Sequence, residues 1–174
     1  MVTLPEVSPR TAGAASLTAS WYPSETFNAE FKWAPAWTND WLFWNGGREF
    51  GRYSRRLDSA GINLSWFPAA RHELRLKSQW LAIRAHDGRG YQLQSTGEMQ
   101  ATGESLSDFD INELGLQLRY RYLLGPQSDV FLAYSRGGAS ERDREGGIGT
   151  GELFEEAPRL RDSDQLLAKI RYRF

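Results

Sequence analysis

The sequence predicts an all-β protein, an antiparallel up-and-down transmembrane β-barrel of about eight strands. Three observations predict it: apolar and polar residues alternate with a period of two, helical spacing is scarce, and short turns alternate with long polar connections. The chain has 174 residues, a net charge of −1 and no cysteine. This length suits one domain, and the lack of cysteine excludes disulfide scaffolds and thiol chemistry.

The expected strands are taken in chain order. Eight segments are expected: 13–22, 26–34, 39–46, 60–67, 73–85, 109–122, 129–137 and 164–174. The first and third alternate least clearly. The second and fifth alternate from Phe27 to Trp33 and from Leu74 to Trp80. The fourth and seventh carry aromatic residues at their ends. In the sixth and eighth, one face is almost entirely apolar and the other is polar or charged, which is typical of strands between two different environments.

The connections predict which ends of the strands meet. Residues 34–39, 68–72 and 123–128 are expected to be short turns containing Pro or Gly, and 45–59, 86–108 and 138–163 are expected to be long, polar loops. Short periplasmic turns and long external loops are typical of outer-membrane barrels. Residues 22–25 are an exception, a short loop on the external side. An even strand count would leave both termini in the periplasm, and eight strands enclose an interior mostly filled by side chains.

Strand length and aromatic placement favour a membrane barrel over a soluble one. The alternating segments run for about ten residues, which matches a tilted membrane crossing. Aromatic residues at strand ends form the expected interfacial girdle: Trp33, Trp44, Trp66, Phe67, Tyr120, Tyr122, Tyr134, Tyr172 and Phe174. A soluble ligand-binding β-barrel or sandwich is the alternative. It would bury the apolar face and turn Arg119, Arg121 and Arg171 to water.

The two ends of the chain carry different predictions. Residues 1–12 are expected to be a disordered or linker start, without a secretory signal in residues 1–10, and residues 13–174 form the barrel domain. Ile170, Tyr172 and Phe174 close an apolar alternation and resemble the signal read by the barrel assembly machinery, a predicted partner. An unpaired edge strand with an apolar face can be captured by strand addition.

Several stretches together resemble one Gram-negative family of unknown function. They are Phe31-Lys-Trp-Ala-Pro-Ala-Trp, Trp41-Leu-Phe-Trp-Asn, Arg71-His-Glu-Leu-Arg-Leu-Lys-Ser-Gln-Trp, Leu116-Gln-Leu-Arg-Tyr-Arg-Tyr, Gly125-Pro-Gln-Ser-Asp-Val-Phe-Leu-Ala-Tyr-Ser-Arg-Gly-Gly and Leu167-Ala-Lys-Ile-Arg-Tyr-Arg-Phe. Members carry an amino-terminal carbohydrate-binding family-nine-like domain ahead of an outer-membrane barrel. The resemblance covers roughly residues 27–174. It implies an outer-membrane location, a carbohydrate link, and a chain that is the last part of a longer protein. If the chain is such a fragment, the eight strands are the last part of a larger barrel.

The polar strand faces supply the candidate site, a basic collar lining the lumen. Its members are Lys32, Arg75, Lys77, Arg119, Arg121, Lys169, Arg171 and Arg173, and the opposing acids are Glu30, Glu73 and Glu113. One interpretation is that the collar binds or passes an anionic solute, or docks an acidic upstream segment as a plug. The other is that these charges pair with one another inside a narrow barrel.

No catalytic residue, metal site or cofactor is predicted. His72 and His86 are expected a membrane thickness apart, and no motif supports a catalytic set. The expected function is a non-enzymatic outer-membrane channel, anchor or receptor module. The expected partners are lipid, lipopolysaccharide and an amino-terminal carbohydrate-binding domain, with no nucleic acid. A barrel enzyme acting on lipid is the rival, and Trp37, Trp41 and Trp44 would alternatively form a sugar-stacking surface.

Overall fold

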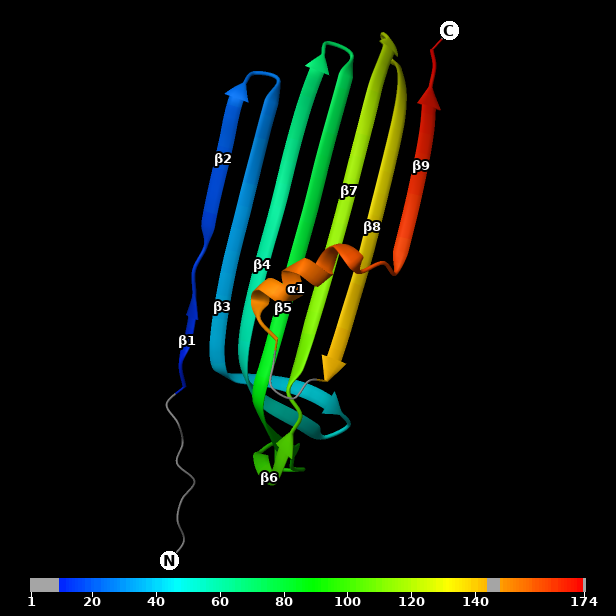
Figure 1. Ribbon diagram of the computed structural model, residues 1–174. Coiled ribbons are helices and arrows are strands. Elements are labelled where there is room, and N and C mark those ends of the chain that lie inside the picture. Colours follow the sequence, from blue (N-terminus) through cyan, green and yellow to red (C-terminus); the bar gives the residue numbers. More distant parts are fainter. Residues whose placement is uncertain (1–9, 144–147, 174) are drawn as a thin grey trace, which may run out of the picture.

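A computed structural model describes residues 10–143 and 148–173, which form one large antiparallel sheet with a short helical segment on one face (Figure 1). The strands are β1 (Ala12–Ala14), β2 (Leu17–Ser24), β3 (Phe27–Gly46), β4 (Glu49–Ala69), β5 (His72–Leu93), β6 (Met99–Leu106), β7 (Phe109–Gly125), β8 (Ser128–Asp143) and β9 (Ser163–Arg171). Between β8 and β9 lie α1 (Thr150–Glu156) and the 3-10 turn η1 (Ala157–Arg159). No helix in these two ranges is long and apolar enough to cross a membrane.

The sheet runs up and down in chain order, which confirms the predicted all-β, antiparallel class. Its order is β1-β3-β4-β5-β7-β8-β9, with β2 also pairing with β3 and β6 also pairing with β5. The chain therefore occupies seven positions across the sheet, because β1 and β2 share one edge and β6 continues the line of β7. Within the described residues the sheet is open: β9 forms one edge and β1 with β2 the other. The predicted closure into an eight-stranded barrel is not formed.

Two of the expected strands are one strand, which corrects the predicted count. Segments 26–34 and 39–46 both belong to β3, and residues 34–38 of the expected turn pair in register with β4. The chain reverses instead at Gly46 and Gly47, whose φ angles of +125° and +52° suit glycine. An Asn-Gly-Gly sequence is a strong hairpin signal. Most of the expected loop 45–59 is consequently the first part of β4.

Of the other two expected long loops, 86–108 is largely strand and 138–163 begins as strand. Residues 86–108 hold the end of β5, a turn and β6, and β8 continues to Asp143 before the helical segment. The three short turns 24–27, 69–72 and 125–128 all lie at one end of the sheet, called here the short-turn end, and the other is the hairpin end (Figure 1). The predicted exception at 22–25 therefore disappears. Strand β1 starts near the hairpin end and β9 finishes at the short-turn end, so the first and last described strands do not bring the chain to one side, as an even strand count would.

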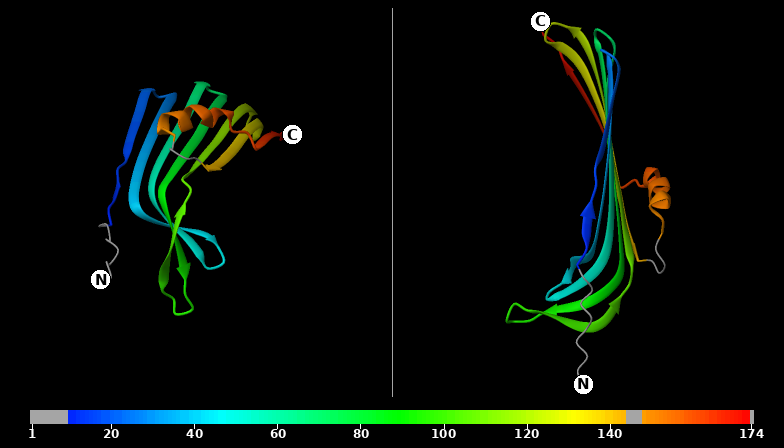
Figure 2. Two further views of the ribbon diagram at one scale, coloured as in Figure 1. Left: turned by 60° about the horizontal axis from the view of Figure 1, so that its bottom comes forward. Right: turned by 90° about the vertical axis from the view of Figure 1, so that its left-hand side faces the viewer.

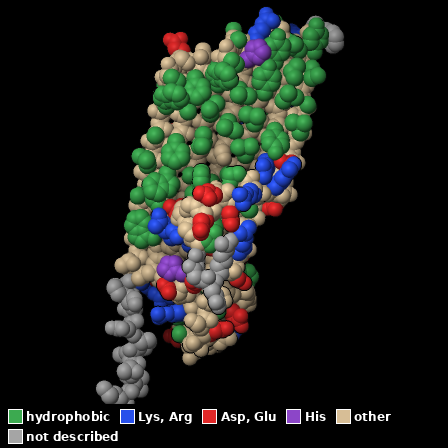
Figure 3. Space-filling model, viewed as in Figure 1, with side chains coloured by type: hydrophobic (Ala, Val, Ile, Leu, Met, Phe, Trp, Pro, Cys, Tyr) green, Lys and Arg blue, Asp and Glu red, His purple; other side chains and the backbone are tan. Residues whose placement is uncertain are grey.

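The face that carries α1, called the helix face, is apolar towards the short-turn end. Cross-strand partners place large apolar side chains there in successive rows, and Figure 3 shows them covering the sheet between its upper end and the helix. Many are exposed: Phe31, Trp33, Ile62, Trp66, Leu118, Leu132, Leu166 and Ile170. The opposite face of the same rows carries the polar and charged side chains, as the alternation predicts.

The polarity of both faces inverts towards the hairpin end. One row beyond Trp80, the helix face carries Asp58 and Asn112, both 1% exposed, and then Arg84 opposite Asp110. Over the same stretch the opposite face becomes apolar, with Ile83 beside Leu57 and Ile111. The sheet therefore has two amphipathic halves. The helix face is the apolar face in the half near the short turns and the polar face in the half near the hairpins, and α1 lies where the two halves meet.

An aromatic cluster forms the core of the hairpin end. Tyr53, Ala85 and Phe109 are buried in it, and Trp41 and Phe43 pack against them. The Tyr53 and Phe109 rings meet edge to face at 5.0 Å. The two hairpins bend away from the helix face, which folds the ends of β3 to β6 around this cluster (Figure 2). The sequence-based prediction put Trp41, Phe43, Ala85 and Phe109 on three separate strands and Tyr53 in a loop, so it did not bring them together as a core.

Alkaline pH should weaken this core through Tyr53. Burial raises the pKa of Tyr53 above its ordinary value of 10.0, and the carboxylates of Asp143 and Asp108 add to the shift. In the unfolded chain the phenol loses its proton first, so the free energy of unfolding falls as pH rises above about 10. Tyr53→Phe should remove the part of this decrease in unfolding free energy that is due to Tyr53. Denaturant unfolding at pH 8 and at pH 10.5 measures the decrease. Tyr22→Phe, at an exposed position, is the control and should leave the fall unchanged.

Candidate functional site

The basic side chains of the predicted collar lie on the face opposite the helix, most of them at the short-turn end. Arg75 faces Arg119 across the β5–β7 ladder, and Arg121 faces Glu73 in the next row. Lys169 and Arg171 reach the same region from β9. We call this group, Arg75, Lys77, Arg119, Arg121, Lys169 and Arg171, the basic strip.

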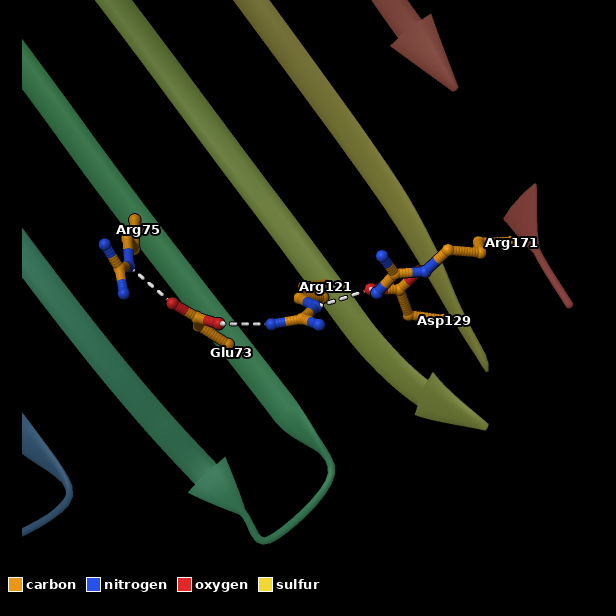
Figure 4. A network of polar contacts seen from close by, with 5 residues as sticks. All are labelled: Glu73, Arg75, Arg121, Asp129 and Arg171. Atoms are coloured by element: carbon orange, nitrogen blue, oxygen red, sulfur yellow. Dashed lines mark hydrogen bonds and ion pairs between the residues drawn. The ribbon is translucent and has the colours of Figure 1, made fainter. Parts of the chain in front are cut away.

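An ion-pair network joins four of the strands across the basic strip (Figure 4). Glu73 lies 2.5 Å from Arg75 Nε and 4.0 Å from Arg121 Nη1. Asp129 Oδ2 accepts hydrogen bonds from Arg121 at 2.7 Å and from Arg171 at 3.0 Å. The network therefore pairs bases on β5, β7 and β9 with acids on β5 and β8, which matches the cross-pairing interpretation for these members.

Three members of the basic strip lie outside this network. Within the described residues, Lys77, Arg119 and Lys169 make no ion pair or side-chain hydrogen bond. Arg119 lines two adjoining hollows. One, of about 240 Å³, is also lined by Glu73, Arg75, Arg121 and Phe131, so three arginines and one carboxylate surround it. The lining of the other, of about 290 Å³, includes Arg75 and Lys77. Two guanidinium groups side by side without a shared carboxylate are suited to bind a carboxylate or phosphate group.

The structure brings most, but not all, of the predicted collar residues together in one region of the sheet. Lys32 lies on β3 in a more distant row, opposite Gly61, and pairs with Glu30 at 3.1 Å. Glu113, an expected opposing acid, faces Leu81 and Ala139, away from the basic strip. Asp129 was missed, although it holds two arginines. Its only sequence signal is its position at the start of an expected strand, just after a Gly-Pro turn.

Arg173 and the predicted assembly signal lie at the end of β9. The Arg173 backbone N–H donates to Ser128 Oγ at 3.0 Å, and its side chain reaches Gln127 rather than the basic strip. Ile170 and Tyr172 are largely exposed at the sheet edge. Phe174 lies outside the described residues.

Two neighbouring arginines of the basic strip should respond to substitution with opposite sign. Arg119→Gln removes a like charge directly opposite Arg75, so it should leave stability unchanged or raise it by up to about 1 kcal/mol at low salt. Arg121→Gln leaves Glu73 and Asp129 short of a partner and should lower stability. Denaturant midpoints at low and high salt measure both effects, and high salt should shrink them. Equal losses from both variants would contradict this view.

The alternative sites from the sequence are not assembled. Trp41 packs in the aromatic cluster, Trp37 lies over Gly13, and the Trp44 indole donates to the Gly47 carbonyl, so the three tryptophans do not share one surface. His72 and His86 lie about 45 Å apart along β5, at about 3.3 Å per residue.

The described part of the chain also holds no assembled catalytic or metal set. His86 contacts the carboxylate of Asp87 at 2.7 Å, and no serine hydroxyl is hydrogen-bonded to it among the described residues. In the same residues no group of three or more His, Asp or Glu side chains is placed to hold a metal ion.

Comparison with known proteins adds no relative to this description. No family model, curated protein or solved structure matches the chain.

Proposed function

We propose that the chain forms part of the wall of an outer-membrane β-barrel, acting without catalysis as a channel, anchor or receptor module. The observation that supports it most is the inversion of polarity along the strands. A membrane wall needs an apolar outer face only where lipid surrounds it, and a polar outer face with its own small core beyond the bilayer. The apolar half of the helix face and the aromatic cluster of the hairpin end meet these two needs.

The apolar stretch of β7 is long enough to cross a bilayer. From Leu114 to Tyr122 its helix face is apolar or aromatic, over a stretch of nine residues. A tilted β-strand crosses a bilayer in about 9–11 residues. Aromatic side chains mark both limits: Trp66, Tyr120 and Tyr122 near the short turns, and Trp33 and Trp80 near the helix. In this proposal the short turns lie on the periplasmic side and the hairpins outside, as in barrels with short periplasmic turns and longer external loops.

The basic strip then faces the barrel interior. Its unpaired cations and the hollows beside Arg119 favour an anionic solute or an acidic peptide segment as the species bound or passed. The soluble-barrel alternative requires the apolar face to be buried within the fold. Leu118 and Ile62, in the middle of that face, are 37% and 43% exposed. The carbohydrate link and the barrel assembly machinery stay predictions.

Cysteine accessibility tests the proposal, because the chain has no native cysteine. Leu118→Cys and Gln117→Cys are neighbours on opposite faces of β7, and Ser95→Cys lies in the turn between β5 and β6. In outer-membrane vesicles from cells that make the protein, a membrane-impermeant maleimide should label Ser95→Cys rapidly and Leu118→Cys only after detergent is added. Gln117→Cys reports whether water fills the interior. If Leu118→Cys is labelled as fast as Ser95→Cys in intact vesicles, the membrane assignment is wrong.

A further inference from the structure

An apolar groove lies on the helix face, where α1 and η1 meet the sheet. Its volume is about 330 Å³, and its walls come from five neighbouring strands, β3, β4, β5, β7 and β8, and from the helical segment. The apolar lining is Phe31, Ile62, Trp80, Leu116, Phe154 and Pro158. This volume falls within the range of ordinary small-ligand sites, about 300–1,000 Å³, and a mostly apolar lining with few polar groups is typical of them.

A small residue makes the floor of the groove. Ser78 lies between its cross-strand partners Ile62 and Leu116, so a row of large side chains is interrupted at its centre. The Ser78 hydroxyl donates to the Gly115 carbonyl at 3.2 Å, which leaves it satisfied. The floor can therefore accept an apolar chain without leaving a buried polar group unpaired.

The helical segment forms the outer wall. The Phe154 ring meets the Trp80 ring edge to face with centroids 5.2 Å apart, yet Phe154 is 57% exposed. Ala157 is buried against the sheet beside it. The groove is thus open along one side to whatever covers the apolar half of the helix face.

A fixed positive charge lines the groove. Arg136 Nη2 donates to the main-chain carbonyls of Pro158 at 2.8 Å and Leu160 at 3.0 Å. These partners are neutral, and among the described residues no carboxylate lies within ion-pair distance of Arg136. Arg136 Nε, which is buried, has no hydrogen-bond partner there. Asp164, the cross-strand partner of Arg136, is bonded to Tyr134 and Arg161, so its one carboxylate is shared electrostatically by two arginines. The guanidinium is therefore held in place at a spot that keeps a net positive charge, which favours an anionic group beside it.

We propose that this groove binds one acyl chain of an anionic membrane lipid, with the lipid phosphate beside Arg136. The inference rests on the proposed function, because that function puts lipid against the helix face. It adds a defined site: the groove lies at the inversion of polarity, where acyl chains give way to headgroups. The groove is continuous with the apolar half of the helix face, so an acyl chain can enter it from there. Arg136 accounts for the preference for an anionic headgroup.

Native mass spectrometry of the whole protein in nonionic detergent tests the site. The probes are phosphatidylglycerol and phosphatidylcholine with identical acyl chains. The wild type should retain one phosphatidylglycerol per chain and prefer it over phosphatidylcholine about tenfold, as expected for one charge-assisted hydrogen bond. Ser78→Phe should fill the floor and abolish retention of both lipids. Ser65→Phe, on the opposite face, is the matched control and should retain phosphatidylglycerol like the wild type.

Variants of Arg136 separate charge from structure. Arg136→Gln should lose the preference for phosphatidylglycerol and still retain phosphatidylcholine, and Arg136→Lys should recover the preference. If Arg136→Lys behaves like Arg136→Gln, or if Ser78→Phe binds lipid like the wild type, the proposed lipid site is wrong. The membrane proposal is tested separately by Leu118→Cys. If Leu118→Cys is protected and Ser78→Phe still retains lipid like the wild type, the membrane proposal stands and only the lipid site in the groove is rejected.

Discussion

Leu118→Arg should lower the free energy of unfolding in lipid vesicles by about 2–4 kcal/mol, the cost of an arginine on the lipid side near a bilayer midplane. Leu118 lies on the helix face midway between Leu114 and Tyr122, the two limits of the apolar stretch of β7. If the helix face were in water, the same change at this 37% exposed position would alter stability by less than about 0.5 kcal/mol.

Ser135→Arg is the matched control for this substitution. Ser135 lies on β8 within one row of Leu118, on the opposite face, with Gln117 and Gln165 as its partners. An arginine there should reach a polar environment and cost little. Guanidinium unfolding of both variants in the same vesicles gives the comparison. Equal costs for the two arginines would show that the two faces do not differ in solvent.

Asn112→Ala should detach α1 from the sheet and cost about 2–4 kcal/mol of unfolding free energy. Asn112, only 1% exposed, accepts a hydrogen bond from the Trp80 indole at 2.8 Å and donates one to the Leu153 carbonyl at 2.7 Å. Alanine leaves a buried donor and a buried acceptor unpaired at once. Amide hydrogen exchange should show loss of protection in residues 150–157, alongside the lower unfolding free energy.

Asn63→Ala controls for the loss of an asparagine from the sheet. Asn63 is exposed on the opposite face and donates only a 3.3 Å hydrogen bond to Glu30, so its removal should change stability by less than about 0.5 kcal/mol. Unchanged exchange in α1 after Asn112→Ala would mean that Leu153 and Ala157, both buried, hold the helix by apolar packing alone.

The face of each basic residue was predictable, whereas its neighbours were not. Within one strand the alternation of side chains decides the face, so Arg119 and Arg121 follow directly from their places among Leu118, Tyr120 and Tyr122. Which residues lie across from them depends on the register between strands, which the turns determine. For that reason the pairing of Arg75 with Arg119 and the part played by Asp129 appear only in the structure.

The aromatic cluster was hidden by shifts in the alternation. The β3–β4 register slips between Thr38 and Trp41, and such an irregularity changes which face the following residues occupy. The ladder between β4 and β5 shifts again between Arg52 and Ser54. A stretch with changing phase looks irregular in the sequence: 39–46 was one of the two least clear expected strands, and 45–59 was expected to be a loop. Only the glycines at 46 and 47 indicated the hairpin.

The seven positions of the sheet have a consequence for any barrel that contains it. Neighbouring strands alternate in direction, so the first position, held by β2, and the seventh, β9, run the same way. Joining those two edges directly would create a parallel ladder. Two copies of this sheet, joined edge to edge in the same membrane orientation, would create two parallel ladders. A wholly antiparallel closed barrel therefore has an even total of strands, and the wall beyond this sheet contributes an odd number.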